Sequence, residues 1–172
     1  MSDKFTFRDG TLTDAAEMAR IYNHYVATSE VIFSDTILSD DDMRAKLKRL
    51  EVGTRFPFLI AEVQGRVAGY AYAHLWQPDP VYAGSWELTM YLDHECRGLG
   101  IGTAMLQRLG EQCRLKGAHV LISCITEGNE ACERMCRRVG FTHAGTLPHT
   151  GYKFGRYLSD AFYYRLLDTK AQ

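Results

Sequence analysis

Two hydrophobic periods alternate along the chain, and each change of period marks a new element. Residues 6–26 begin with a short run of the two-residue period of a strand and continue with apolar residues at helical spacing. Thr13 stands where a helix N-cap is expected, and Asp14 and Glu17 occupy the first turn, where the helix dipole favours acids. We therefore predict a strand followed by a helix.

A second helix and a hairpin follow in the same half of the chain. Ser39 precedes residues 40–51, where acidic residues come first and basic residues later, as the dipole of a helix favours. Residues 56–76 alternate as two strands around the dipeptide Gln64-Gly65, which is typical of a tight hairpin turn. The pattern predicts one helix and then two antiparallel strands.

Strands and helices alternate in the next part of the chain. Residues 85–93 and 119–125 have the pattern of strands. Between them a helix is predicted from Gly102 to Lys116, with Gly117 as its stop.

The final segment adds a helix and further strands. Asn129 is a predicted N-cap for a helix over residues 130–139 that Gly140 ends, and the tail from Phe141 supplies one or two strands with a Gly/Pro-rich excursion between them. The predicted order is β-α-α-β-β-β-α-β-α-β, with room for another strand. The turn-rich residues 76–85 are a candidate substrate loop.

Size and charge narrow the function classes. A chain of 172 residues with 46% hydrophobic content suffices for one core, so we predict a single domain over residues 1–172. The net charge of −1 provides no field that recruits nucleic acid or an anionic membrane. The polar first residues and the absence of about 18 consecutive apolar residues predict neither a signal peptide nor a membrane span.

The thiols and imidazoles predict no metal and no disulfide framework. The five cysteines form no C-x-x-C pair, which favours reduced thiols and a soluble, cytoplasmic protein. The six histidines show no ligand spacing such as H-E-x-x-H, so we predict that no metal is bound.

Residues 96–102, CRGLGIG, are the most distinctive chemical motif. A dinucleotide-binding G-x-G-x-x-G fails, because its third glycine would fall on Thr103 or Met105. A P-loop fails as well, because no Lys-Ser or Lys-Thr follows the last glycine. Backbone N–H groups at positions without side chains, followed by a helix N-terminus, outline an anion cradle. A plain glycine-rich turn fits these seven residues equally well.

The run Arg97-Gly98-Leu99-Gly100-Ile101-Gly102 resembles the Q/R-x-x-G-x-G/A signature of the GNAT superfamily of N-acetyltransferases. Three further stretches, IYNHYVATSEVIF (21–33), GYAYAHLW with ELTMYL (69–76 and 87–92) and GTLPHTGYKFGRYLSD (145–160), resemble its phosphinothricin and methionine sulfoximine N-acetyltransferase group. The resemblance implies the α/β GNAT fold, with a mixed, mostly antiparallel central sheet of about six or seven strands and helices on both faces.

The resemblance also implies a cosubstrate, acetyl coenzyme A. A backbone N–H in the strand before the glycine run would polarise the acetyl carbonyl, and Asn129 would contact the cosubstrate arm, although it reads equally well as a helix cap. The implied cofactor-binding residues are Met90, Tyr91, Leu92, Arg97, Gly98, Leu99, Gly100, Ile101, Gly102, Thr103 and Asn129.

Acetyl transfer to an amine needs a base, because an alkyl amine with a pKa of about 10 is almost wholly protonated at neutral pH. Glu87 matches the strand glutamate that has this role in the resembling group, and we expect burial beside Trp86 to raise its pKa. Taken alone, Glu87 also reads as a solvated strand residue. Cys136 stands where relatives commonly carry Tyr or His, so we expect solvent or a nearby tyrosine to protonate the thiolate.

The resemblance implies a small amino-acid-like amine as the acceptor, bound partly by cations. Lys153 and Arg156 are the predicted cations, and Trp76, Gln77 and Thr89 complete the candidate substrate-binding set. Relatives often carry an arginine where Gln77 stands, so we expect phosphinothricin to be a poor substrate.

Other readings stay open. One is an acetyltransferase for protein N-termini or ribosomal proteins, and another is a noncatalytic acetyl-coenzyme-A-binding module. A homodimer that pairs through the C-terminal strands is also implied by the resemblance.

Overall fold

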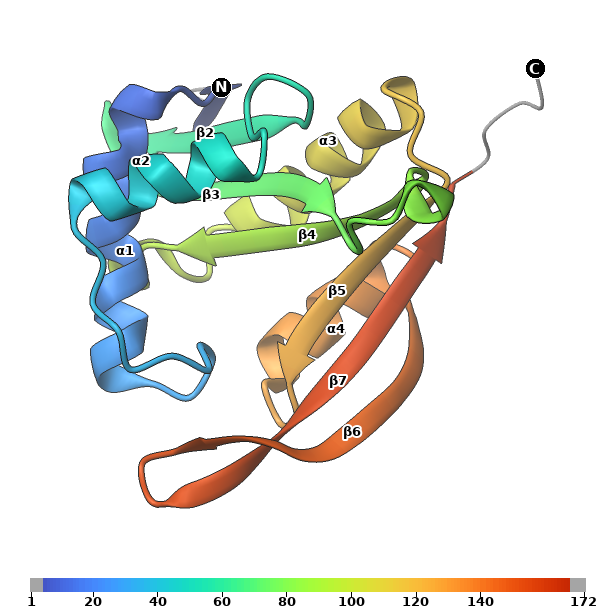
Figure 1. Ribbon diagram of the computed structural model, residues 1–172. Coiled ribbons are helices and arrows are strands. Elements are labelled where there is room, and N and C mark those ends of the chain that lie inside the picture. Colours follow the sequence, from blue (N-terminus) through green and yellow to red (C-terminus); the bar gives the residue numbers. More distant parts are fainter. Residues whose placement is uncertain (1–4, 168–172) are drawn as a thin grey trace.

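The computed structural model describes residues 5–167, which form seven strands, four α-helices and three short 3₁₀ turns (Figure 1). The predicted order of elements is confirmed, with the additional strand present. The strands are β1 (Thr6–Asp9), β2 (Phe58–Val63), β3 (Arg66–Leu75), β4 (Ser85–Leu92), β5 (Val120–Thr126), β6 (Thr142–Lys153) and β7 (Arg156–Leu166). The helices are α1 (Ala15–Thr28), α2 (Asp40–Arg49), α3 (Ile101–Leu115) and α4 (Glu130–Arg138).

The strands form one mixed sheet in the order β1-β2-β3-β4-β5-β7-β6. Every neighbouring pair is antiparallel except β4 and β5, which run parallel. A parallel pair needs a crossover, and α3 provides it between β4 and β5. The mixed, mostly antiparallel sheet is therefore as predicted.

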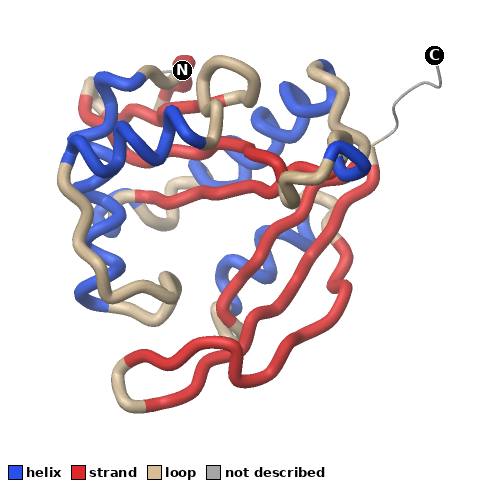
Figure 2. Tube along the Cα trace, viewed as in Figure 1, coloured by secondary structure: helices blue, strands red, loops and turns tan. Residues whose placement is uncertain are grey.

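The parallel pair is short, and this shapes the whole molecule. β4 and β5 pair only from Ser85 to Glu87 and from Val120 to Ile122. Beyond this point β4 pairs with β3 alone and β5 with β7 alone, so the sheet divides into two arms. The arms diverge visibly in the ribbon and the tube (Figures 1 and 2).

Each face of the sheet buries its own hydrophobic cluster. Alternate residues of β2 supply both clusters, because successive side chains of a strand point to opposite faces. Phe58 and Ile60 pack with α1 and α2, whereas Leu59 and Ala61 pack with the side of the sheet that α3 and α4 cover. Helices thus lie on both faces, as predicted. None of the helices within residues 5–167 has the length and apolar character to cross a bilayer.

The entry into α1 differs from the sequence prediction. Thr11, and not Thr13, is the capping residue: its hydroxyl accepts a hydrogen bond from the Thr13 N–H at 3.3 Å and caps a 3₁₀ turn over Leu12–Asp14. The Asp14 carboxylate accepts from the Thr11 N–H at 2.8 Å, which completes a capping box. The cap moves by two residues because Asp14 ends a 3₁₀ turn: its carboxylate bonds back to Thr11 and also contacts Arg8, six residues earlier in the chain.

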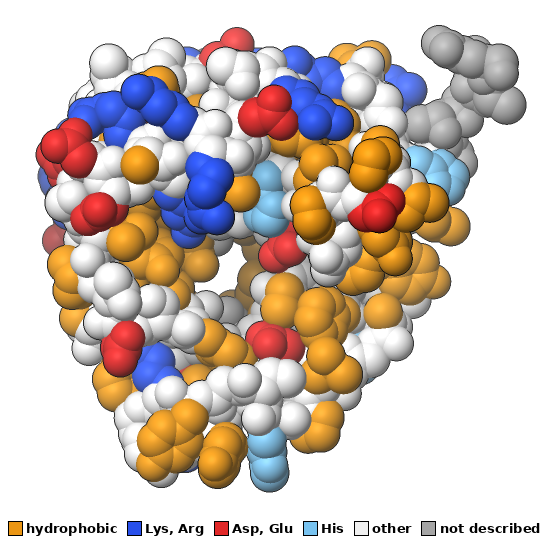
Figure 3. Space-filling model, viewed as in Figure 1, with side chains coloured by type: hydrophobic (Ala, Val, Ile, Leu, Met, Phe, Trp, Pro, Cys, Tyr) orange, Lys and Arg blue, Asp and Glu red, His pale blue; other side chains and the backbone are white. Residues whose placement is uncertain are grey.

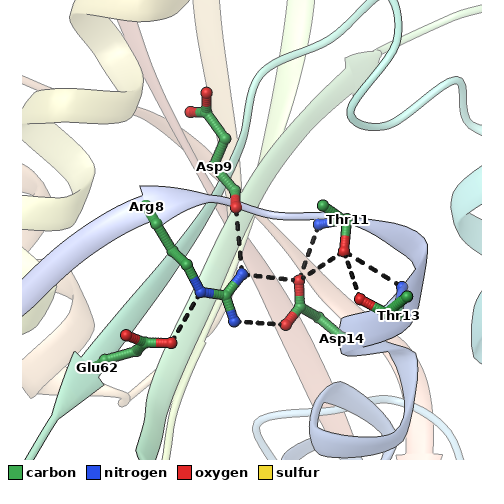
Figure 4. A network of polar contacts seen from close by, with 6 residues as sticks. All are labelled: Arg8, Asp9, Thr11, Thr13, Asp14 and Glu62. Atoms are coloured by element: carbon green, nitrogen blue, oxygen red, sulfur yellow. Dashed lines mark hydrogen bonds and ion pairs between the residues drawn. The ribbon is translucent and has the colours of Figure 1, made fainter. Parts of the chain in front are cut away.

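The contact between Asp14 and Arg8 is a partly buried ion pair (Figure 4). Arg8 Nη1 and Nη2 donate to the two oxygens of Asp14 at 3.0 and 2.6 Å, and Arg8 Nε donates to Glu62 at 2.8 Å. The Asp14 side chain is only 8% exposed. Burial alone would raise the pKa of Asp14, but the hydrogen bonds from Arg8 and Thr11 lower it on balance.

The hairpins are made by residues with positive φ. Gln64 and Gly65 have φ of 51° and 75°, which confirms the predicted tight turn between β2 and β3. The Gly/Pro-rich excursion was placed wrongly, because residues 145–151 lie inside β6, where the pairing with β7 shifts register. Pro148 has no N–H to donate, so a bulged strand accommodates it. The turn between β6 and β7 uses Phe154 and Gly155.

Replacing Asp14 by asparagine tests the Arg8 network. We expect the free energy of unfolding at pH 7 to fall by about 2 kcal/mol, because a charge-assisted pair is lost and Arg8 keeps its charge. Since the pKa of Asp14 is lowered in the folded state, its contribution is present at neutral pH and is lost as the pH falls below about 4. Urea titrations at several pH values measure both effects.

The matched control is Asp41→Asn, whose side chain is 92% exposed. We expect it to change stability by under about 0.5 kcal/mol. An equal loss in both variants would contradict a special role for Asp14.

Candidate active site

The glycine run forms the N-terminus of α3 in an open conformation. Gly98 and Gly100 have φ of 78° and 84°, in the left-handed region that other residues rarely adopt. A Cβ added at either position would meet no atom within 4 Å. No side chain caps α3, so the N–H groups of its first turn point outward without a side-chain acceptor. The first turn of α3 therefore offers backbone N–H donors to which an anion can bind.

The third glycine of the run serves packing. A Cβ on Gly102 would lie 2.9 Å from Met135 Sδ of α4 and 3.3 Å from Leu92 Cδ1 of β4. The lack of a side chain therefore lets α3 approach both neighbours. The two apolar residues of the run also differ in burial. Leu99 is 40% exposed beside the cradle, whereas Ile101 is 1% exposed in the core.

Arg97 links the cradle to α1. Its Nη2 donates to the Tyr25 hydroxyl at 3.1 Å, and its guanidinium lies over the Tyr25 ring at 5.4 Å. The Tyr25 hydroxyl in turn donates to the carbonyl of Leu92 at 2.6 Å. One tyrosine thus connects α1, the end of β4 and the residue that opens the glycine run. Thr103 lies half-buried in the first turn of α3.

Beyond Glu87, β4 has a free edge whose backbone groups face the gap, meaning the space between the β3–β4 arm and the β5–β7 arm of the sheet. The carbonyl of Ser85 and the N–H of Asp93 form hydrogen bonds on the β3 side. Successive residues of a strand direct their backbone groups to opposite edges, so the odd-numbered residues of β4 face β3. Leu88, Met90 and Leu92 therefore direct their N–H and C=O groups toward the gap. The Leu92 carbonyl is already taken by Tyr25. Met90 is the clearest free donor and acceptor beyond the point where the strands part.

Tyr91 does not belong to this backbone edge, which corrects the prediction for the Met90 to Leu92 stretch. Its N–H and C=O point toward β3 by the same alternation. Its ring packs under α1, with centroids 5.9 Å from Tyr22, 5.9 Å from Tyr25 and 5.6 Å from Tyr70. Burial raises the pKa of Tyr91 strongly, so it stays neutral there.

Asn129 lies across the gap from β4, after the end of β5. Its side chain accepts a hydrogen bond from the Cys132 N–H at 3.3 Å, which confirms it as the N-cap of α4. The residue is half-buried, and its amide NH₂ remains able to donate.

Glu87 is half-buried at the point where β4 and β5 part. Burial raises the pKa of the carboxyl, the charge of Asp160 raises it further, and His74 opposes the shift. The expected neighbour was wrong, however. Trp86 points to the opposite face, into the core cluster beneath α3, where its Nε1 donates to the Ala83 carbonyl at 2.8 Å.

The actual neighbours of Glu87 were missed in the sequence. His74 pairs with Glu87 in the β3–β4 register, and its Nδ1 lies 2.8 Å from the Leu75 carbonyl, which makes Nδ1 the donor. Asp160 comes from β7 and accepts from the Cys124 thiol at 3.3 Å. Alternation along residues 69–76 would have put His74 on one face with Tyr72, but the register with Glu87 was not visible in the sequence.

The two predicted substrate cations are engaged within the chain. Lys153 is 8% exposed, and its Nζ donates to the carbonyls of Ser29 and Ile32 at 2.8 and 2.9 Å. Arg156 forms an ion pair with Glu30. Both therefore fasten the segment after α1 to the β6–β7 hairpin, and this corrects the expectation that they present their charges to a substrate.

The other substrate candidates surround the gap more loosely. Thr89 lies two residues beyond Glu87 on the same face of β4. Trp76 packs edge-on against Tyr82, at 5.5 Å between centroids, in the loop between β3 and β4, where Gln77 is exposed. Figure 3 shows this face hollowed between the helical half of the molecule and the β6–β7 hairpin, with both acidic and basic side chains around the hollow.

Metal ligands are not assembled in the part of the chain that the structure describes. Within residues 5–167, no three His, Cys, Asp or Glu side chains are grouped so that they could hold a metal ion.

The chain is similar to known proteins of one enzyme family. The model of the acetyltransferase (GNAT) family matches residues 18–141. The chain is 33% identical to an L-methionine sulfoximine/L-methionine sulfone acetyltransferase of Pseudomonas paraeruginosa, over 95% of each chain.

Two solved structures are similar in fold and sequence. A phosphinothricin acetyltransferase of Sinorhizobium meliloti, solved in complex with acetyl coenzyme A, has a TM-score of 0.90 and 31% identity, covering 95% of this chain and 89% of that one. A ribosomal-protein-alanine N-acetyltransferase of Brucella melitensis has a TM-score of 0.88 and 35% identity, covering 94% and 99%.

Two substitutions at Gly100 test whether the cradle depends on left-handed backbone. Gly100→Ala should lower the free energy of unfolding by about 1 kcal/mol, because alanine is strained at positive φ. Gly100→Asn should cost less, since asparagine tolerates this region. Urea denaturation of the two variants measures the difference. Equal losses would show that the conformation is not the cause.

Proposed function

The chain belongs to the GNAT family and is an acetyl-CoA-dependent N-acetyltransferase, and we propose that its acceptor is the primary amine of a small amino-acid-like molecule. The relatives named for methionine sulfoximine and phosphinothricin support this acceptor class. The observation that carries the proposal is Glu87, a partly buried carboxylate with a raised pKa at the point where β4 and β5 part.

The cradle and the gap fit acetyl coenzyme A. Backbone N–H groups from Gly98 to Thr103 would hold the diphosphate at the uncapped end of α3, where the helix dipole favours anions. The Met90 backbone edge and Asn129 on the far side of the gap would hold the arm between the two strand arms. When bound, the cosubstrate supplies the activated acetyl thioester.

Glu87 would act as the general base. An ammonium group must lose a proton before its nitrogen can attack, and a carboxyl whose pKa is raised toward neutrality by burial takes that proton more readily than an exposed one. The Met90 N–H would donate to the carbonyl oxygen as negative charge develops there. Both groups lie on β4, so one strand positions the base and the oxyanion donor.

Protonation of the thiolate is assigned to solvent or a nearby tyrosine. Cys136 is 1% exposed within the core cluster that α4 helps to cover, which fits a packing role.

We also propose that the protein is a homodimer paired through its C-terminal strands. The β6–β7 hairpin exposes three large rings, with Tyr152 at 66%, Phe154 at 58% and Tyr157 at 63% exposure. Aromatic side chains clustered on one element are typical of protein interfaces.

Glu87→Gln tests the assigned base. We expect kcat to fall at least about a hundredfold, with little change in the KM for acetyl coenzyme A, because the amide cannot accept the proton. Steady-state thiol release measures both constants. An unchanged kcat would contradict the role of Glu87.

The same variant separates chemistry from folding. Burial raises the pKa of Glu87, which means that the folded state favours the protonated carboxyl over the carboxylate. The contribution of the protonated form to stability is therefore present at low pH and is lost as the pH rises through the pKa of the folded state. Glu87→Gln should therefore unfold at the same or a higher urea concentration than the wild type at pH 8, and the difference should vanish near pH 4.

A panel of acceptors tests the substrate class. Thiol release from acetyl coenzyme A is measured with methionine sulfoximine, phosphinothricin, free amino acids and short peptides. Turnover of free amino acids or their analogues is expected, with phosphinothricin among the poorer because Gln77 is uncharged.

The second candidate is acetylation of protein N-termini, which the resemblance to a ribosomal-protein-alanine N-acetyltransferase favours. Turnover of peptides alone would support this candidate over a small acceptor. Turnover of no acceptor at all, with acetyl coenzyme A bound, would favour a noncatalytic module.

A further inference from the structure

Asp160 and Glu87 lie on the same face of the sheet, the one opposite α3 and α4, which is here named the acceptor face. Glu87 pairs with Ile122 of β5, and Asp160 of β7 pairs with Thr126 of β5. Directly paired residues point to the same face, as do alternate residues of one strand. Ile122, Thr126 and the cysteine between them therefore put both carboxylates on the face opposite α3 and α4. Asp160 is close enough for its charge to act on Glu87.

The charge of Asp160 is not neutralised by its partners. Its Oδ1 accepts from the Cys124 thiol at 3.3 Å, and its Oδ2 accepts from the Thr150 hydroxyl at 2.9 Å. Both donors are neutral. Within residues 5–167, Asp160 forms no ion pair. The side chain is half-exposed, so it can reach a ligand.

The two cations of the β6–β7 hairpin are already engaged within the chain. Lys153 is held by two backbone carbonyls, and Arg156 is paired with Glu30. The loop after β3 offers the uncharged Gln77. Two further basic groups lie on this face near Glu87: His74, and Arg49, whose charge acts on Tyr72. Asp160 itself has only neutral partners, so a second anionic group on the acceptor would be repelled beside Asp160.

We infer that Asp160 is a specificity-determining residue that selects acceptors with a second cationic group, such as a basic amino acid or a diamine, over neutral or doubly anionic amines. This inference rests on the proposed function, because it concerns the acceptor of that same reaction. The ammonium or guanidinium group of the acceptor binds the Asp160 carboxylate, while the reacting amine approaches Glu87. A charge-assisted hydrogen bond of this kind changes affinity by about tenfold to a hundredfold.

Arginine and citrulline form a matched pair of acceptors for the test. Each has one α-amine, and the side chains have nearly the same shape but differ in charge. For the wild type we expect kcat/KM for arginine to exceed that for citrulline by at least about tenfold. α-Aminoadipate, with a terminal carboxylate, should be poorer than citrulline.

Asp160→Asn should reduce the arginine-to-citrulline ratio to near one, through a loss with arginine alone. Asp160→Glu keeps the charge and should retain a preference for arginine. Asp9→Asn is the matched control, because it makes the same charge change on the exposed far edge of the sheet, at β1. Its ratio should equal that of the wild type, and urea titration of each variant verifies folding.

The outcomes separate the two claims. A wild-type ratio near one, or an unchanged ratio in Asp160→Asn, would overturn this inference while turnover of citrulline or methionine sulfoximine still supports the proposed function. No turnover with any amine would overturn both.

Discussion

The early separation of β4 from β5 is the constraint on which the rest of the structure depends. Three paired residues on each strand join the two arms, and beyond them each arm relies on its outer neighbour for hydrogen bonds. Backbone groups that a continuous sheet would consume are left at an edge. An unpaired strand edge is a template for further backbone pairing, so this division leaves a place where the arm of acetyl coenzyme A, as proposed above, can form hydrogen bonds.

The arms stay apart because other contacts hold each of them. Tyr25 anchors α1 to the end of β4 and to Arg97, whereas the Thr126 hydroxyl donates to the carbonyl of Glu30 at 2.9 Å, joining β5 to the segment after α1. Packing of Gly102 against Met135 sets the distance between α3 and α4 on the other side. The separation is therefore braced by contacts on both faces of the sheet.

Local chemistry could be read from the sequence, and long-range pairing could not. Ser39 and Asn129 were identified as caps because their partners lie three residues away. Thr13 was predicted as a cap in place of Thr11, because the pattern did not indicate the 3₁₀ turn over Leu12–Asp14 that precedes α1. Glu87 was found through its strand and the family resemblance, but its neighbours His74 and Asp160 follow from strand register. Lys153 is visibly a cation in any sequence, whereas its carbonyl partners appear only when the chain has folded.

The position of Glu87 on one face and of the cradle beside helices of the other has a kinetic meaning. With the roles proposed above, the acceptor approaches from the face of α1 and α2 and the donor's diphosphate from the end of α3 on the other face, so neither substrate needs to pass the other. Such a layout suits a ternary complex that assembles in random order, with each product leaving on its own side of the sheet. Substitutions in β7 and in the loop after β3 can then change the acceptor site without changing the donor site.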